Sequence, residues 1–575
     1  MMQRCLLALA LSASASAQVN IGPAVRVDTG GNAAANETSV AISPAAPLRL
    51  LSAWNDYRVG NARLGVSLSE DGGTTWLDQI LRPPLAHQTV DEGDPMTAFD
   101  GRTGKMWAGG IAFGAGGGVF VAALEFGASA FTAPVMAKLT AAADKGWMAA
   151  GPDPLNPGAS LLHIAYNQGL ITSADEGQNW SSPLSLGSGF GFLPRVGSAG
   201  ELYVSFWSGG PPIFLWRSFD GGQSMLGPTQ IANRMDFWTD GSDRVPGDFR
   251  VPPLPSMAVD PTTGDLHTIF CDTTDVTGLE TNLDLYWTTS TDQGLNWSTP
   301  VVIHGDSTPT ADQFFPWLEI DADGRLHVVW FDTRHNAQLD ADPAALIDVH
   351  YAYSEDSGQS WSEQRITTSS FSSANDGFSG TFMGDYLGLA TAGGRTLIAY
   401  PDTSSGDPDL YVHSIVHGTA TSFCFGIACP CGNEDPSAGC GNSGLDGLVS
   451  TGGLLTVASG TASIAADDLV LRSSGLGTGQ FGLMFTSLVS TRVPFGAGVR
   501  CIDGPFYRYP LLPTNPAGEL DLGPGQVIGI SQSAFGPLGQ VASGATWNYQ
   551  AWYRDPFGPC GATFNTTNAL AITWQ

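Results

Sequence analysis

The sequence predicts an all-β protein, a seven-bladed β-propeller followed by a small disulfide-rich β-sandwich. Three observations predict it. An octet, Ser-x-Asp-x-Gly-x-x-Trp, recurs along the first 420 residues. Short apolar strands recur between turns, in a chain with 73 Gly and 37 Pro. Six of the eight cysteines lie beyond residue 420. A ring of six blades is the alternative for the first region.

The octet occurs as four full copies and one copy that lacks the final Trp. In a strand-turn-strand hairpin the Asp carboxylate accepts backbone N–H groups of the turn, and the Gly supplies a positive φ. The Trp packs flat between neighbouring blades. We therefore expect a structural role for the octet, not a catalytic one. The copies begin at Ser69, Ser173, Ser218, Ser290 and Ser354.

The spacing of the octets sets the number of repeat units. The Asp residues of the first two copies are 104 residues apart (175 − 71), about twice the other intervals, so a unit without an octet lies between them. Seven units of four short strands result. The seventh unit (384–416) lacks a fourth strand, and residues 22–30 resemble one that belongs to no earlier unit. We expect this segment to close the ring and remove the open edge.

The chain begins with an apolar run followed by Ala15-Ser16-Ala17, a pattern typical of a signal-peptidase site. The sequence therefore predicts a signal peptide at 1–17, a propeller at 18–420 and a cysteine-containing β domain at 421–575. No later apolar stretch has the length of a membrane span. We expect a secreted or cell-surface-associated protein.

The charge balance narrows the class of partner. Fifty-four Asp and Glu oppose 24 Lys and Arg, for a net charge of -30, and only three of the cations are Lys. Such a negative field disfavours nucleic acid and anionic membranes. We expect a monomer.

The cysteines predict how the C-terminal region is stabilised. Six cysteines of an exported segment indicate three disulfides, with 15 pairings open. Zinc binding by the cluster at 424–440 is the alternative, although the paired C-x2-C spacing is missing. Cys271 stands alone, and we expect it to be a free, buried thiol on a second strand. The six are Cys424, Cys429, Cys431, Cys440, Cys501 and Cys560.

The octet resembles the Asp-box, or BNR repeat, of sialidases (neuraminidases) and other Asp-box propellers, over about residues 19–420. The resemblance implies an enzyme acting on glycans, a glycoside hydrolase such as an exo-α-sialidase, with a glycan or glycoprotein as its substrate or partner. Because Asp-boxes also occur in propellers without this chemistry, the alternative is a non-catalytic propeller for carbohydrate or protein binding and adhesion at the cell surface. The end of the chain, 547–574, resembles a C-terminal module of secreted planctomycete proteins.

Blade topology predicts which face carries a site. The octet turns lie on one face, whereas the loops after second strands and the connections between blades lie on the other. Polar and aromatic side chains gather on these second-face segments, and Asp-Arg pairs that merely tie loops together are the alternative interpretation. The candidates are Glu37, Asp56, Arg58, Arg250, Asp332, Arg334 and Tyr386.

The sialidase resemblance assigns roles to these candidates. It implies a carboxylate clamp of Arg58, Arg250 and Arg334, because guanidinium forks bind carboxylates. It also implies Tyr386 as a nucleophile. Glu37 is the expected partner of that Tyr, with Glu92 and Glu280 as alternatives, and an Asp such as Asp56 or Asp332 supplies the acid/base. The segment 249–252, Phe-Arg-Val-Pro, resembles the family's Phe/Tyr-Arg-Ile-Pro motif, but it precedes the fifth unit instead of the first.

Two further features bear on ligands. Acidic insertions at 272–284 and 338–348 offer oxygen donors that suit Ca²⁺, although a solvated loop is the preferred interpretation of both. No other cofactor is expected. In the C-terminal region, alternating aromatic residues either stack on sugars or pack within a strand. They are Trp547, Tyr549, Trp552 and Tyr553.

Overall fold

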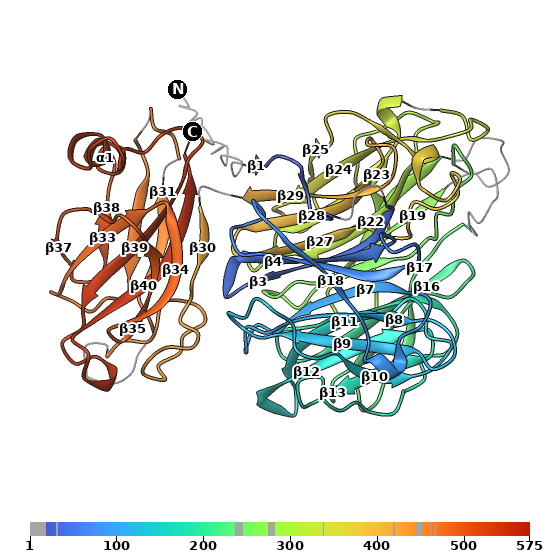
Figure 1. Cartoon of the computed structure of the whole chain (residues 1–575), viewed down its shortest axis with the longest axis horizontal. Helices are drawn as coiled ribbons and strands as arrows, with labels where there is room; N and C mark the ends of the chain where they lie inside the picture. Colours follow the sequence, from blue (N-terminus) through green and yellow to red (C-terminus); the bar gives the residue numbers. More distant parts are fainter. Residues whose placement is uncertain are drawn as a thin grey trace, which may run out of the picture.

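The structure is a computed structural model of the 575-residue chain (Figure 1). It describes residues 19–29, 33–235, 245–273, 282–336, 338–417, 420–443, 451–459, 462–465 and 467–574. The predicted signal peptide lies outside these residues. Across the described residues, no helix is both long and apolar enough to cross a membrane.

Within the described part of 19–417, the chain forms seven antiparallel sheets, each wound in sequence order. The first four sheets are β3 (Ala35–Ser43), β4 (Ala46–Asp56), β5 (Arg63–Ser69) and β6 (Leu77–Leu81); β7 (Glu92–Phe99), β8 (Met106–Ala112), β9 (Gly118–Leu124) and β10 (Val135–Leu139); β11 (Trp147–Asp153), β12 (Asn156–Tyr166) and β13 (Gly169–Ser173); and β14 (Phe190–Val196), β15 (Leu202–Trp207), β16 (Pro212–Ser218) and β17 (Leu226–Asn233).

The remaining three sheets are β18 (Ser256–Val259), β19 (Leu266–Thr273), β20 (Leu283–Ser290) and β21 (Val301–Val302); β22 (Gln313–Ile320), β23 (Leu326–Asp332), β24 (Leu346–Ser354), β25 (Ser362–Arg365) and β26 (Phe371–Ser372); and β27 (Gly388–Ala392), β28 (Arg395–Asp402) and β29 (Asp409–His417), joined by β1 (Val19–Ile21) and β2 (Val25–Arg26). Short 3-10 turns lie at Leu85–His87, Arg334–Asn336 and Ser373–Asn375.

The first strand of each sheet packs against the first strand of the next. These contacts run from β3 through β7, β11, β14, β18 and β22 to β27, and β27 returns to β3. Sheets that meet by their first strands and close on themselves form a β-propeller. The predicted all-β propeller fold is therefore confirmed.

Ring closure uses the N-terminal segment, as the sequence predicts. Val19 pairs with His417 and Val25 with Val412, so β1 and β2 form the outer edge of the sheet that contains β29. Residues 25–26 lie within the predicted segment 22–30, and the pairing also extends to 19–21, just before it. Gly22 and Val27 add backbone bonds to Ser414 and Leu410. The last sheet is thus completed by the start of the chain.

The octet has the predicted local structure. In the first copy, Ser69 Oγ donates to Asp71 Oδ1 (2.9 Å), and the same carboxylate oxygen accepts the backbone N–H of Thr75 (2.9 Å). Gly73 has φ +96° and donates its N–H to Ser69 Oγ, while the Trp76 indole donates to the Gly73 carbonyl. The Ser-Asp and Gly-Ser bonds recur at 173–180, 218–225, 290–297 and 354–361. Each octet is a self-contained hairpin turn.

The C-terminal region adds a second set of sheets around its own core. Residues of β31, β32 and β38 pack against residues of β33, β39 and β40 in one buried apolar cluster. The elements are β30 (Thr421–Phe423), β31 (Leu454–Ser459), β32 (Val470–Ser474), β33 (Phe481–Ser487), β34 (Val489–Phe495), β35 (Gly498–Asp503), β36 (Tyr507–Arg508), β37 (Leu512–Pro513), β38 (Leu520–Leu522), α1 (Val527–Ala534), β39 (Thr546–Arg554), a 3-10 turn at Pro559–Gly561 and β40 (Phe564–Thr573).

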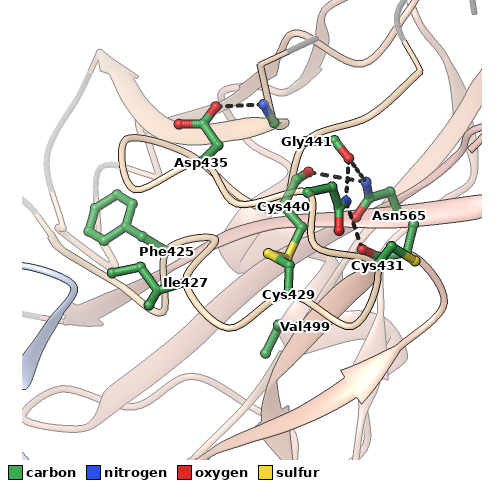
Figure 2. Close-up of a disulfide and its surroundings, with 12 residues drawn as sticks. Phe425, Ile427, Cys429, Cys431, Asp435, Cys440, Gly441, Val499 and Asn565 are labelled. Carbon is green, nitrogen blue, oxygen red and sulfur yellow. Dashed lines mark hydrogen bonds between the residues drawn. A yellow bond between two sulfur atoms is a disulfide. The ribbon is translucent and has the colours of Figure 1, made fainter. Parts of the chain in front are cut away.

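The six C-terminal cysteines form three disulfides, as predicted. The bridges are Cys424–Cys501, Cys429–Cys440 and Cys431–Cys560, and Figure 2 shows the second beside the Asn565 amide, which donates to the Cys440 and Gly441 carbonyls. Since all six sulfurs are in disulfides, they do not bind zinc. Disulfides persist in oxidising compartments, which supports an extracellular location. Cys271 is free and fully buried on β19, as expected.

The aromatic residues of β39 belong mainly to this core. Trp547, Tyr549 and Tyr553 are at most 2% exposed, and only Trp552 is partly accessible. The first three rings therefore pack within the region and do not form a sugar-stacking surface.

Candidate functional site: a central charged cluster

Several non-glycine residues with positive φ lie at or near the start of the innermost strands. Glu37 has φ +52°, Asp94 φ +51° and Phe315 φ +52°, and each lies at a register shift of β3, β7 or β22. Lys145, with φ +49°, lies two residues before β11. Bulges re-aim side chains, and residues held in this region of φ concentrate at functional sites. The bulges therefore mark the ring centre as a candidate site.

The side chains at these positions form what we call the central cluster: Glu37, Asp94, Asp144, Lys145, Arg250, Asp385 and Tyr386. Lys145 Nζ lies 2.9 Å from Glu37 Oε1 and is ion-paired to Asp385. Arg250 forms a two-pronged pair with Asp385, at 2.8 and 2.5 Å. These contacts join segments up to 348 residues apart in sequence (385 − 37).

Further hydrogen bonds hold the carboxylates of Glu37 and Asp94 in place. The Asn55 amide donates to Glu37 Oε2 (2.8 Å), and its oxygen accepts the Asp94 N–H (3.0 Å). The Lys145 N–H donates to Asp94 Oδ2 (2.8 Å). Asn55 therefore links Glu37 to the backbone of Asp94, and Lys145 contacts both carboxylates, which preorganises the centre of the ring.

The two carboxylates that share Lys145 have opposite pKa shifts. Burial raises the pKa of Glu37 to about 8, although Lys145 partly opposes this shift. Burial also acts on Asp385, but Lys145 and Arg250 outweigh it and hold the pKa of Asp385 below its usual value. Burial lowers the pKa of Lys145, and Asp385 and Glu37 outweigh that effect and raise it. At neutral pH, Asp385 and Lys145 are charged and Glu37 carries a proton.

Tyr386 lies beneath this cluster in an aromatic layer. Its ring centroid is 5.3 Å from that of Trp147 and 6.2 Å from that of Trp317. Burial, followed by the charges of Glu37 and Asp94, raises the pKa of Tyr386 well above its usual value. The buried phenol therefore stays protonated.

A partly exposed aromatic rim adjoins the cluster. The Tyr57 ring contacts Phe378 edge-on (centroids 5.0 Å apart), and Phe378 contacts Phe382 (5.4 Å). The Arg250 guanidinium lies 4.6 Å from the Phe382 ring centroid, and 35% of the Arg250 side chain is exposed. With Asp144 also exposed, solvent reaches the cluster from this side.

The predicted candidates divide into two groups. Glu37, Arg250 and Tyr386 come together in the central cluster. Arg58 instead bonds Asp56 (Nε to Oδ2, 2.6 Å) and Asp78 of the outermost strand β6 (2.8 Å).

Arg334 behaves like Arg58. It pairs with Asp332 (2.6 Å) and with Glu363 of the outermost strand β25 (2.7 Å). Each of the three predicted clamp arginines is therefore bound by its own carboxylates. Among the alternatives, Glu92 pairs with Arg82, and Glu280 lies outside the described residues.

Sequence reasoning missed Lys145, which connects the cluster. The available signal was its rarity, because the chain has three Lys in all, and its position directly after Asp144 before an inner strand. The segment 249–252 has a partly structural explanation: Phe249 and Val251 are fully buried, while Arg250 between them turns toward Asp385.

The insertions predicted to suit calcium are only partly described. In 338–348, the Asp348 carboxylate accepts bonds from Arg365, Thr367 and Ser370 (2.6–2.8 Å), so protein donors already engage it. Residues 274–281 of the other insertion lie outside the described part. Calcium binding stays a prediction.

A cavity of about 460 Å³ lies away from the central cluster, between the first octet and the C-terminal region. Arg395, Thr74 and Asn548 are among its lining residues. We assign the candidate site to the central cluster instead, because charged groups from β3, β7 and the connections before β11, β18 and β27 meet there.

No protein-family model matches the sequence, and no curated protein matches it. Solved structures with a similar fold include a protein of unknown function from Dyadobacter fermentans (14% identity, TM-score 0.41, 69% of this chain and 99% of that one). Others are the BP39L lectin of Burkholderia pseudomallei (14%, 0.42, 66% and 96%) and the NanB sialidase of Streptococcus pneumoniae (12%, 0.38, 69% and 71%). At these identities and TM-scores, the similarities carry no argument about the function of this chain.

Proposed function

We propose that the chain is an exported, seven-bladed propeller that binds a glycan at the central cluster, with the propeller ending near residue 420 and a separate β domain after it. The observation that carries the proposal is the meeting of Lys145, Arg250 and several carboxylates beside the partly exposed rings of Tyr57, Phe378 and Phe382.

Sugar chemistry fits this arrangement. Hydroxyl groups donate to carboxylates and accept from ammonium and guanidinium groups, and charge-assisted bonds are the stronger ones. Aromatic faces pack against the apolar C–H faces of a sugar ring. Together, donors, acceptors and a flat apolar rim are what a pyranose requires.

The charge of the cluster selects among sugars. Arg250 is already bound by Asp385, and Lys145 by Asp385 and Glu37. Since Asp94 and Asp144 add further carboxylates, the cluster favours neutral or amino sugars over those that bear a carboxylate. The separate pairing of Arg58 and Arg334 points the same way, so a sialidase-type arginine clamp is the less supported version of the proposal.

A second candidate function is glycoside hydrolysis. The observation that favours it is the split between Glu37, protonated at neutral pH, and the ionised Asp385, because glycosidases combine a carboxylic acid with a carboxylate. In this version Glu37 is the general acid. Tyr386 as a nucleophile would require a base to remove its proton.

The test of binding uses a glycan array probed with the untagged chain, followed by calorimetry on the best neutral ligand. Tyr57→Ala and Arg250→Ala should each weaken binding at least tenfold. Arg472→Ala, which breaks a pair with Asp521 in the C-terminal region, is the matched control and should bind like the parent chain. Exclusive binding of sialylated glycans, or equal affinity in all three variants, would contradict the proposal.

Hydrolysis is tested separately, with neutral aryl glycosides and an aryl sialoside. If the second candidate is right, a neutral substrate is cleaved and Glu37→Gln loses most of kcat, because it removes the acid. If the parent chain binds glycans but cleaves none of these substrates, only the binding function is supported.

A further inference from the structure

Two imidazoles face each other on the sheet that contains β22–β25. His335 lies in the 3-10 turn after β23, and His350 lies on β24. Their Nε2 atoms are 3.0 Å apart, and the rings are stacked with centroids 5.1 Å apart. His350 is buried (3% exposed), whereas His335 is exposed. The pair thus combines one fixed and one accessible nitrogen.

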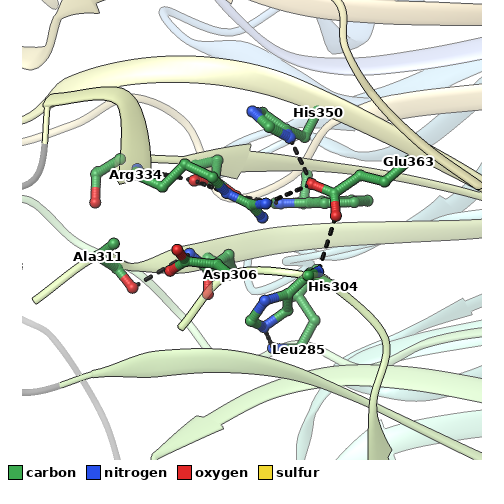
Figure 3. A network of polar contacts seen from close by, with 12 residues as sticks. Leu285, His304, Asp306, Ala311, Arg334, His350 and Glu363 are labelled. Carbon is green, nitrogen blue, oxygen red and sulfur yellow. Dashed lines mark hydrogen bonds and ion pairs between the residues drawn. The ribbon is translucent and has the colours of Figure 1, made fainter. Parts of the chain in front are cut away.

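The His350 ring is held by its other nitrogen. Nδ1 lies 2.8 Å from Glu363 Oε1, and Figure 3 shows Glu363 between His350 and Arg334. Glu363 also accepts the Gly305 N–H (3.0 Å), and Trp330 packs near the ring of His350. Because Nδ1 donates to the carboxylate, the lone pair of His350 is on Nε2 and points to His335. Metal-binding histidines are oriented by the same kind of carboxylate contact.

The distance between the two nitrogens suits a shared ion. Histidine nitrogen lies about 2.0–2.1 Å from a bound first-row metal. Two such bonds with nitrogens 3.0 Å apart enclose roughly a right angle at the metal, the angle of square-planar or octahedral coordination.

We propose that His335 and His350 bind one divalent transition-metal ion, such as Cu²⁺ or Zn²⁺, through their two Nε2 atoms, with water completing the coordination. Imidazole nitrogen suits these ions, whereas Ca²⁺ takes oxygen ligands. The site shares no residue with the central cluster and does not depend on the proposed function.

Neighbouring carboxylates support the site without being its ligands. Asp332 and Glu363 each offer an oxygen within 4.8 Å of a His350 ring nitrogen and of one another. Arg334 bridges both of them, at 2.6 and 2.7 Å, and so keeps them engaged. The negative charges of Asp332 and Glu363 offset the positive charge of Arg334, which would otherwise repel a bound cation. Glu363 also fixes the orientation of the His350 ring.

The experiment titrates the untagged chain with CuCl₂ and ZnCl₂ at pH 7.5, by calorimetry and, for Cu²⁺, by electron paramagnetic resonance. We expect one ion per chain and hyperfine splitting from two nitrogens. His335→Ala should weaken binding at least tenfold, and so should His350→Asn, whose amide can still donate to Glu363. His87→Ala, which removes an imidazole elsewhere, is the control.

The alternative is a direct imidazole–imidazole hydrogen bond with no metal. The proposal would be overturned if the parent chain bound neither ion at 1:1 stoichiometry. It would also be overturned if the His335→Ala variant bound the ion as tightly as the His87→Ala variant. Because His335 is exposed, its variant stays folded and the result is decisive even if His350→Asn unfolds.

Discussion

Glu37 and Asp385 illustrate at the residue scale how one ammonium group determines two protonation states. Both carboxylates are buried against Lys145, but only Asp385 also receives the Arg250 fork. One carboxylate therefore keeps its charge and the other keeps a proton. The consequences for pH and for substitution differ between the two residues.

The raised pKa of Glu37 predicts a falling stability with rising pH. A Glu has a pKa of about 4.3 when unfolded, and the folded value is about 8, so the folded chain holds more protons between these values. Its free energy of unfolding should decrease across that window. Glu37→Gln should lose this decrease of the unfolding free energy with pH, because the variant has no carboxyl group to titrate. Glu434→Gln, at an exposed position, should keep the decrease. Denaturant unfolding at pH 5 to 8 measures it; identical slopes in both variants would refute the assignment.

Lys145 should stabilise the fold as well as the site. Lys145→Met leaves Glu37 and Asp385 without their shared cation, and breaking a buried pair costs about 3–5 kcal/mol. Lys138→Met, on β10 near the surface, should change stability by less than about 1 kcal/mol. Urea denaturation distinguishes the two. Equal losses would mean that the ion pairs of Lys145 contribute little.

At the scale of elements, the octet turns tie neighbouring sheets together. Gly358 has φ +86°, and a Cβ there would overlap the Trp287 ring. Gly264 has φ +79° with open space around it. Gly264→Ala should cost about 1–2 kcal/mol for the backbone alone, and Gly358→Ala about 1–3 kcal/mol more for the overlap. Thermal unfolding of both variants checks this; similar losses would show that Trp287 moves aside freely.

The turns and the site differ in how far a sequence pattern reveals them. Each octet makes its hydrogen bonds within eight residues, so local residues such as Ser69 and Asp71 are enough to predict the turn. The central cluster joins Glu37, Lys145 and Asp385, whose spacing follows from ring closure and has no local period. Strand order indicates the face on which the connections between blades lie, and most residues of the cluster belong to these connections. The partners of Arg58 and Arg334 were not, because Asp78 and Glu363 lie on outer strands.

At the scale of the whole molecule, the N-terminal strands close the ring and the disulfides stabilise the C-terminal region. Deleting residues up to 29 would leave β29 with an open edge and remove the bond from Leu410 to Asp28. We expect the shortened chain to unfold at lower temperature and to associate on size-exclusion chromatography. A monomeric chain of unchanged stability would show that β1 and β2 are dispensable.

The disulfide pattern gives a separate whole-chain prediction. If the predicted signal peptide at 1–17, which includes Cys5, is removed, the unfolded, unreduced protein should show one thiol, that of Cys271. Reduction should raise the count to seven and destabilise chiefly the C-terminal region, because the three bridges constrain its unfolded state. Thiol titration before and after reduction measures both counts. Three or more thiols before reduction would contradict the pairing.

The central claim is that the ring centre, and not the cavity beside the C-terminal region, is where a glycan binds. The most direct measurement is a crystal structure with the best neutral oligosaccharide from the array. We predict sugar density within hydrogen-bond distance of Lys145 or Arg250 and in contact with Tyr57. Density confined to the cavity lined by Arg395 and Asn548 would contradict the claim.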